Sequence, residues 1–260
     1  MKLSDKDLAA AVELNQAHWL RIEALMPWVH FRDDGDSLRV FAGDTWPRNR
    51  VALARFNSAS VQQRVSEILA PHLKAKVACT WIVGPLSEPP DLEQHLRAQG
   101  FHCMIRCAGM ARELKSLPPA PPEPPGVQIE PMDEPALLQP LTTERRRQRH
   151  HALTVAARLK PPEVWHFIAR HKNRHVGGTT LLCAAGVAGI YGVEVLKEYR
   201  RRGIGAALMH TALRHAKQLG FSASVLSASG MGEQLYAKLG FREVCRLAFW
   251  KYGKMRQLTD

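Results

Sequence analysis

Apolar residues recur along the chain at two spacings, one typical of helices and one of strands. At residues 5–26 they return every three or four positions, which predicts an amphipathic helix that Pro27 ends. Further helices are predicted at 60–72 with Ser60 as the cap, at 91–99, 134–158 and 231–239, and from the glycine loop at 203–205 to about Leu219. Apolar runs of strand length predict strands at 38–42, 51–55, 78–83, 102–113, 127–130, 164–170, 176–184, 187–195, 224–227 and 244–251. This mixed order predicts an α/β (α+β) fold.

A proline-rich stretch divides the chain. Residues 118–125 hold six prolines in eight positions, a composition that favours extended polyproline II and cannot join a helix or a central strand. We interpret 118–126 as a semi-rigid linker between two modules, at 1–117 and 127–260. These two parts are called the first half and the second half below.

Composition narrows the class of protein. The chain has 260 residues, 45% of them hydrophobic, and a net charge of +12, which fits a folded protein with an anionic ligand or partner. No apolar run has the length of a membrane span, and the N-terminus lacks the apolar core of a signal peptide. We therefore expect no membrane association. The five cysteines are scattered, so we expect no metal site and a cytoplasmic location.

The segment after the predicted strand 187–195 carries the clearest chemistry. Arg200, Gly203 and Gly205 have the spacing Arg-x-x-Gly-x-Gly, directly before a predicted helix. Glycines let a ligand approach the backbone, and the first N–H groups of a helix are unpaired and partly positive. The segment is therefore suited to bind a pyrophosphate. It has no Gly-Lys-Ser/Thr, and Leu208 stands where a dinucleotide fingerprint needs a small residue. The remaining alternative is a glycine-rich turn with a solvated basic face.

A second motif lies downstream, in the segment Ser229–Phe241. Together with Arg-x-x-Gly-x-Gly, it resembles the GNAT superfamily of N-acetyltransferases. Tyr236, Gly240 and Phe241 match the family pattern Asn-x-x-Ala-x-x-Leu-Tyr-x-x-x-Gly-Phe, whereas Ser229 and Gly232 replace its Asn and Ala. The order of predicted elements over 127–260 is also that of the family.

This resemblance implies acetyl-CoA as the cofactor and a small-molecule or peptide amine as the acceptor. The backbone of Arg201–Ala206 would cradle the pyrophosphate, and Val193 and Val195 would pair with the pantetheine amides. The resemblance also implies that Tyr236 is the general acid. Glu194 is either the general base or a structural carboxylate. The implied cofactor-binding residues are Val193, Val195, Arg200, Arg201, Arg202, Gly203, Ile204, Gly205, Ala206 and Ser229.

The first half contains a short echo of the second. Residues 92–101 align without gaps on 232–241, an offset of 140 residues, with Glu, Gln, Gly and Phe in common. Either the match is due to chance, or the chain consists of two tandem GNAT-like modules, each a mixed sheet flanked by helices. In the second case the first module is degenerate, because Leu96 replaces the tyrosine and no Arg-x-x-Gly-x-Gly precedes its helix.

The expected function is acetyl-CoA-dependent transfer of acetyl to a primary amine. The alternative is a basic nucleic-acid-binding or acetyl-CoA-sensing regulatory protein on the same scaffold, suggested by the charge and by the run Arg145–Arg149. We do not expect nucleic acid as a partner, because the sequence has no helix-turn-helix, zinc-finger or RNA-binding motif. The acceptor and the oligomeric state cannot be read from the sequence.

Overall fold

The computed structural model describes residues 3–44, 49–117, 119–132, 163–172 and 174–253. The predicted helix at 134–158 and the basic run 145–149 lie outside these residues. No helix in the described ranges is long and apolar enough to span a bilayer.

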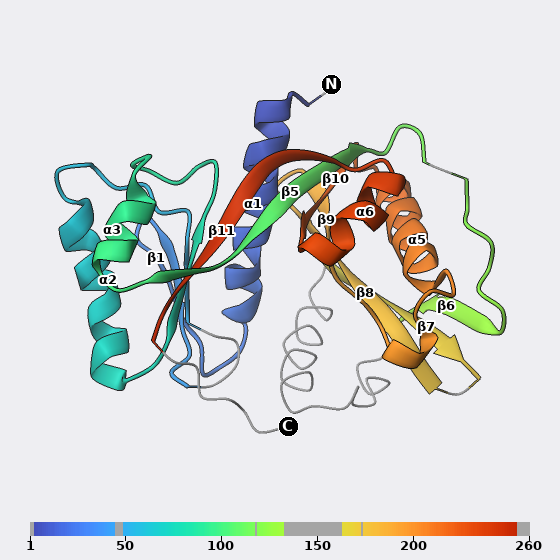
Figure 1. Cartoon of the computed structure of the whole chain (residues 1–260), viewed down its shortest axis with the longest axis horizontal. Helices are drawn as coiled ribbons and strands as arrows, with labels where there is room; N and C mark the ends of the chain where they lie inside the picture. Colours follow the sequence, from blue (N-terminus) through green and yellow to red (C-terminus); the bar gives the residue numbers. More distant parts are fainter. Residues whose placement is uncertain (1–2, 45–48, 118, 133–162, 173, 254–260) are drawn as a thin grey trace.

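One mixed sheet of eleven strands runs through both halves, in the order β1-β2-β3-β4-β11-β5-β10-β9-β8-β7-β6 (Figure 1). Its strands are β1 His30–Asp33, β2 Leu38–Phe41, β3 Arg50–Ala52, β4 Cys79–Val83, β5 His102–Glu113, β6 Val127–Pro131, β7 Val164–His171, β8 Arg174–Ala184, β9 Val187–Val195, β10 Ala223–Ala228 and β11 Arg242–Tyr252. The helices are α1 Asp5–Glu23, α2 Val61–Ala75, α3 Leu92–Ala98, α5 Ile204–Gln218 and α6 Gly230–Lys238, with a 3-10 turn, η2, at Lys197–Tyr199. The α/β (α+β) prediction is confirmed.

Most predicted elements are present, and the differences have local causes. The pattern missed β1, whose four residues are mostly exposed, and also the short η2. The predicted strand 51–55 ends early, because Leu53 takes a left-handed conformation with φ of 52°. Ser60 occupies the N-cap of α2, but its side chain makes no capping hydrogen bond; its hydroxyl instead donates to the carbonyl of Asn57 at 3.3 Å.

The two halves follow the same order of elements and exchange their last strands. Apart from α1, which precedes the strands of the first half, each half has a run of antiparallel strands (β1–β3 in the first half, β6–β9 in the second), a helix, a strand parallel to the last of that run, a second helix and a long final strand. β5, the final strand of the first half, pairs with β10, whereas β11, the final strand of the second half, pairs with β4. The two long strands cross between the halves in Figure 1. The sheet is therefore continuous, and each half completes the other.

The pairing of β5 with β11 repeats the offset of 140 residues that the sequence echo shows. The central pair is Cys107 with Leu247, residues that are themselves 140 apart. On either side, Ile105 pairs with Phe249 and Gly109 with Cys245, so that exchanging the two strands by 140 residues reproduces the same pairs. The register also shifts at the equivalent place in each strand. Local two-fold symmetry thus relates the two strands.

Side chains that alternate along the strands divide between two layers of helices. Ala108, Met110 and Leu226 pack against α5, and Trp81 and Trp250 pack among the core residues of α2 and α3. The alternate residues Ala111, Val225 and Leu247 pack against α1, as expected for a period of two. Helix α1 therefore covers the face of the sheet opposite α2, α3, α5 and α6, and it contacts strands of both halves.

Candidate functional site

The glycine loop begins α5 as the sequence predicts. Gly203 is the N-cap with φ of 81°, a conformation that any side chain would strain. The first helical backbone bond is donated by the N–H of Ala207 to the carbonyl of Gly203. The N–H groups of Ile204, Gly205 and Ala206 therefore precede the helical ladder and point out of the helix end. A helix end of this geometry is suited to an anion.

The three arginines beside this helix end are exposed, and they differ in what they contact. The Nε of Arg200 donates to the carbonyl of Val195 at 3.0 Å, so this side chain turns back to the end of β9. Arg202 donates to the carbonyl of Glu198 at 3.0 Å and lies over the ring of Tyr199. Arg201 takes a left-handed backbone conformation with φ of 63°. The arginines thus place three cations around the loop, and Arg200 and Arg202 are held by backbone carbonyls of Val195 and Glu198.

Strands β9 and β10 separate next to this loop. Their parallel pairing comprises Ala188 with Ser224 and Gly189 with Val225. Beyond these pairs β9 continues to Val195 beside β8, while β10 continues to Ala228 beside β5. We call the space between residues 190–195 and 226–228 the open gap. The edge of β9 that faces this gap carries backbone N–H and C=O groups to which an extended ligand could bind.

A β-bulge causes this separation. The register of β8 with β9 shifts between Gly178 and Thr180, so that two residues of β9, Gly192 and Val193, face one residue of β8. Gly192 has φ of 61°, which glycine adopts readily. Thr179 lies opposite the bulge, and its hydroxyl donates to the carbonyl of Tyr191 at 3.2 Å. A bulge bends its strand and increases the twist, which turns the end of β9 away from β10.

The bulge also decides where the side chains at the end of β9 point. Val193 and Val195 pack against the core under α5. Glu194 lies between them in sequence and is half-buried, so alternation directs its side chain to the opposite face, the one that α1 covers. The structure thus brings Val193 and Val195 to the face with the glycine loop, and it places Glu194 on the other side of the sheet.

Helix α6 brings Tyr236 to the same region. Leu235, the preceding residue, contacts the position of a Cβ on Gly205 at 3.8 Å, and Val195 does so at 3.9 Å. The ring of Tyr236 packs on Phe241 and over Gly232. A Cβ on Gly232 would come within 2.7 Å of this ring, so the glycine that replaces the family's alanine accommodates the tyrosine. Burial raises the pKa of Tyr236, which keeps its hydroxyl protonated at neutral pH.

Ser229 is exposed at the end of β10 and forms the N-cap of α6 without a capping bond from its side chain. Its carbonyl instead accepts from the N–H of Gly232 at 2.7 Å. This places Ser229 beyond Ala228, the last residue of β10 along the open gap. The predicted residues of the loop, of β9 and of α6 therefore converge on one region of the second half.

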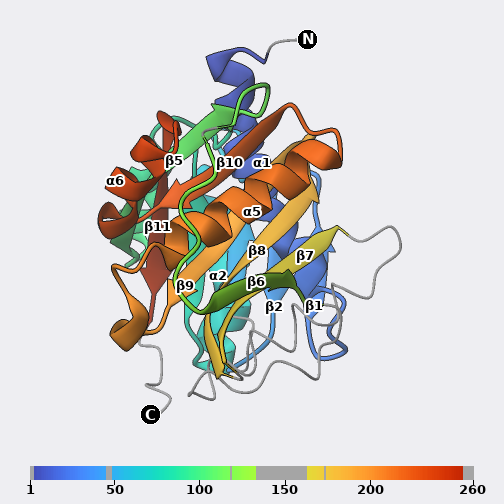
Figure 2. The same ribbon diagram turned by 90° about the vertical axis from the view of Figure 1, so that its right-hand side faces the viewer.

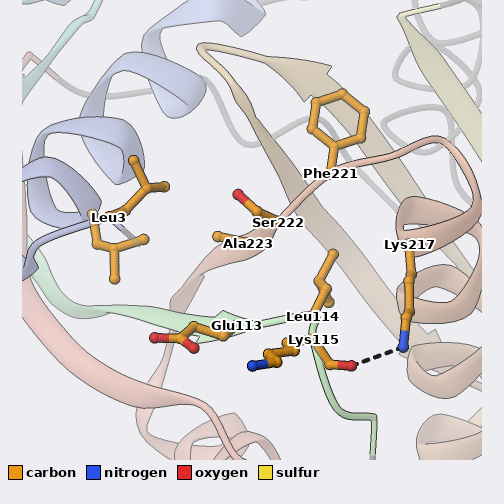
Figure 3. A pocket seen from close by; sticks show the side chains of 9 residues that line it. Leu3, Glu113, Leu114, Lys115, Lys217, Phe221, Ser222 and Ala223 are labelled. Atoms are coloured by element: carbon orange, nitrogen blue, oxygen red, sulfur yellow. Dashed lines mark hydrogen bonds between the residues drawn. The ribbon is translucent and has the colours of Figure 1, made fainter. Parts of the chain in front are cut away.

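A separate cavity lies at the opposite end of α5. It has a volume of about 550 Å³ and is lined by the start of α1, the end of β5 and the start of β10, including Leu8, Leu114 and Phe221 (Figure 3). Lys217, in the last turn of α5, donates to the carbonyl of Lys115 at its rim. The fifteen residues of α5 separate this cavity from the glycine loop by roughly 20 Å at 1.5 Å per residue. It is not part of the site.

Comparison with known proteins agrees with this geometry. Residues 162–243 match a family described as an acetyltransferase (GNAT) domain. These residues include the bulge, the glycine loop, α5 and Tyr236. The matched residues lie within the second half. No curated protein matches the sequence.

Solved structures match nearly the whole chain. A GCN5-related N-acetyltransferase from Kribbella flavida aligns with a TM-score of 0.64 and 17% identity, covering 92% of this chain and 95% of the other. A GCN5-related N-acetyltransferase from Sphaerobacter thermophilus aligns with a TM-score of 0.60 and 19% identity, covering 96% and 93%. A tandem GNAT protein from the clavulanic acid biosynthesis pathway gives 0.60 and 17%, covering 92% and 94%. At these identities the matches establish the fold, and this chain has the GNAT fold.

Two features of the site were missed by sequence reasoning. One is the bulge, for which an isolated glycine at 192 inside a strand pattern was an available signal. The other is the contact of α1 with both sides of the open gap, described below. That contact joins residues more than 170 positions apart, and no local pattern reports it.

Proposed function

We propose that the protein is an acetyl-CoA-dependent N-acetyltransferase with its active site in the second half. The observation that carries the proposal is the open gap directly beside an uncapped, glycine-started helix. The family match over residues 162–243 supports acyl transfer as the class of reaction. The acceptor we propose is a primary amine of a small molecule or a peptide.

The residues present fit coenzyme A. The N–H groups of Ile204, Gly205 and Ala206 would hold the pyrophosphate, with the nearby arginines adding positive charge. Space at Gly205 suits this role, because even a Cβ there would make only ordinary contacts. The gap-facing edge of β9 at Val193 and Val195 would bind the pantetheine amides as a neighbouring strand would. Bound there, acetyl-CoA supplies an activated thioester.

The chain's own groups would then act at three atoms. Glu194 would accept a proton from the ammonium of the acceptor, directly or through water, because only the neutral amine attacks a carbonyl. A backbone N–H near Val195 would donate to the developing oxyanion. Tyr236 would donate its proton to the sulfur as the carbon–sulfur bond breaks, and the raised pKa keeps that proton available.

The first half would not bind a second cofactor. Its parallel strands β3 and β4 also pair only at two positions, Arg50 with Thr80 and Val51 with Trp81. Beyond them the chain itself occupies the space: the N–H of Glu88 donates to the carbonyl of Ala54 at 2.8 Å, and the N–H of Phe56 donates to the carbonyl of Glu88 at 3.1 Å. We call this space the filled gap. It supports the proposal of a degenerate first module and one acetyl-CoA per chain.

Calorimetry on the full chain, combined with an assay of thiol release, tests the function. We expect acetyl-CoA to bind once per chain, and free thiol to appear with at least one member of a panel of primary amines. Binding without thiol release for any amine would favour an acetyl-CoA sensor. Lack of binding, together with nucleic-acid affinity that falls steeply with salt, would favour the nucleic-acid alternative.

A further inference from the structure

A residue of α1 is bound to the strand that forms one side of the open gap. Asn15 is fully buried, and its amide uses both ends. Its Nδ2 donates to the carbonyls of Leu182, Ala184 and Val187 at 3.2, 2.9 and 3.4 Å, in the hairpin that joins β8 to β9. Its Oδ1 accepts from the hydroxyl of Tyr191 at 2.7 Å. One side chain of the first half thus fixes this hairpin of the second.

Tyr191 is the residue directly before the bulge, so its position governs the end of β9. Its hydroxyl is bound to Asn15, its ring packs edge-on against Trp19 of α1 at 5.4 Å, and its carbonyl accepts from Thr179. Gly189 lies two positions earlier, and a Cβ there would overlap Oδ1 of Asn15. The approach of β9 to the gap is therefore held by α1 through close contacts.

The next residue of α1 is bound to the other side of the open gap. The hydroxyl of Ser227 donates to Oε1 of Gln16 at 3.2 Å. Ser227 belongs to the part of β10 that lies beyond its pairing with β9. Two consecutive residues of one helix therefore contact the two strands where those strands separate. Helix α1 lies on the face of the sheet opposite α5 (Figures 1 and 2).

We propose that Asn15 and Gln16 are positioning residues that set the width of the open gap, so that transfer in the second half depends on a helix of the first. The inference rests on the proposed function for its catalytic consequence. Its structural part stands on the hydrogen bonds alone. Positioning matters because a misplacement of about 1 Å can lower a rate by roughly 100-fold.

Three variants test the two sides of the gap: Asn15→Ala, Tyr191→Phe and Ser227→Ala. Tyr191→Phe removes a single hydroxyl and so protects the test if Asn15→Ala fails to fold. Ser227→Thr keeps the hydroxyl and should restore the behaviour of the wild type. Arg21→Ala is the matched control, because Arg21 lies on the same helix in an exposed ion pair with Asp33.

Hydrogen exchange and kinetics give separate readouts. We expect the amides of residues 190–195 to exchange faster in Asn15→Ala and Tyr191→Phe, while the amides of α5 keep wild-type rates in these variants. In the control Arg21→Ala, residues 190–195 should also exchange at wild-type rates. In Asn15→Ala, Tyr191→Phe and Ser227→Ala we expect kcat at saturating acetyl-CoA to fall roughly 10- to 100-fold. The Kd of acetyl-CoA should change less than threefold, because the glycine loop is untouched.

Two outcomes would overturn the inference. The first is unchanged hydrogen exchange at residues 190–195 in Asn15→Ala and Tyr191→Phe, a measurement that needs no cofactor or acceptor. The second is a lower Tm together with wild-type kcat below that Tm, which would make the contacts structural only. Failure of the wild-type chain to bind acetyl-CoA would instead contradict the proposed function, and would leave the exchange result to decide the positioning.

Discussion

The open gap and the filled gap occupy equivalent places in two halves with the same order of elements. In both, a strand leaves its parallel neighbour after two paired positions and passes through a left-handed residue, Gly192 in one half and Leu53 in the other. In the second half we propose that acetyl-CoA binds the edge of β9 beyond these pairs. In the first half Glu88 binds the equivalent edge through its backbone.

The helix starts beside the two gaps differ in the charged groups that surround them. At α5 the loop offers glycines and three arginines. At the start of α2, Asn57 already accepts from the N–H of Ala59 at 2.8 Å, and Arg64 is bound to Asp36 and Glu67. Carboxylates within the protein thus already pair with this cation at the start of α2. Topology provides both gaps, and we propose that the local sequence determines which one binds acetyl-CoA.

The largest effect should come from Tyr236, the proposed proton donor, whose equivalent in the first half is Leu96. Tyr236→Phe should lower kcat roughly 10²- to 10⁴-fold, the range for loss of a general acid, and leave the Kd of acetyl-CoA unchanged. Because burial raises the pKa of Tyr236, the wild-type rate should not decline through loss of this proton as pH rises from 7 to about 10, the ordinary value for tyrosine.

Steady-state kinetics across that pH range, with calorimetry for the Kd, provide the measurement. A Tyr236→Phe enzyme with wild-type kcat at every pH would remove Tyr236 from the mechanism. The first half offers no counterpart to substitute, because Leu96 occupies the equivalent position and is fully buried.

The next largest effect should distinguish the two helix ends. Gly203→Glu should weaken acetyl-CoA binding by roughly 10²- to 10³-fold, because a carboxylate beside the pyrophosphate costs several kcal/mol. Ser60→Glu makes the same change at the N-cap of α2 and should leave the Kd unchanged.

Calorimetry on the full chain measures both constants. Gly203→Ala is a second control, since it adds the strain of φ of 81° without the charge. Equal loss of affinity in Gly203→Ala and Gly203→Glu would show that strain, and not the charge, prevents binding. Weakened binding in Ser60→Glu would place a cofactor in the first half and overturn the comparison.

The sequence could predict much of this arrangement, because its signals are local. Apolar spacing located β5 at 102–113 with both ends correct, and the glycine spacing located the start of α5. The offset of 140 residues was visible at 92–101. The exchange of β5 and β11 could not be read, since hydrogen bonding between strands leaves no mark on the apolar pattern of either strand. Asn15 looks like any polar residue of an amphipathic helix until its partners are known.

The exchange of β5 and β11 between the halves also shows that the proline-rich linker does not separate two independent sheets. A cut at residues 118–126 would separate β5 from β10, and β11 from β4, although all four lie in one sheet. The linker divides the chain in sequence, whereas the pairing of the long strands joins the halves in space. Each comparison between the halves is therefore made on the full chain.

A third effect concerns what holds the filled gap closed. Glu13 of α1 accepts from the N–H of Leu86 at 2.6 Å and from the hydroxyl of Ser87 at 3.1 Å. Glu13→Ala removes the acceptor of both half-buried donors, and the loss of these two hydrogen bonds should cost about 1–3 kcal/mol of unfolding free energy. Denaturant unfolding measures that cost, and hydrogen exchange should show faster exchange at 84–88. If exchange there stays at wild-type rates, Glu13 does not hold the segment, and backbone bonds alone fill the gap.

The smallest effect is the dependence of that contact on pH. Burial raises the pKa of Glu13 above its ordinary value of 4.5, although hydrogen bonds from Leu86 and Ser87 oppose the shift. The folded state therefore binds the proton more tightly than the unfolded state. The stability that this protonation adds is fully present below pH 4.5 and is lost as pH rises through the folded pKa.

Glu13→Gln keeps an acceptor for Leu86 and cannot ionise, so it should be more stable than the wild type at pH 7, with a difference that shrinks toward pH 4.5. Urea unfolding of both proteins at intervals between these values measures the difference. A constant difference across this range would mean that Glu13 titrates alike in the folded and unfolded chain, and that the filled gap is closed without a buried charge.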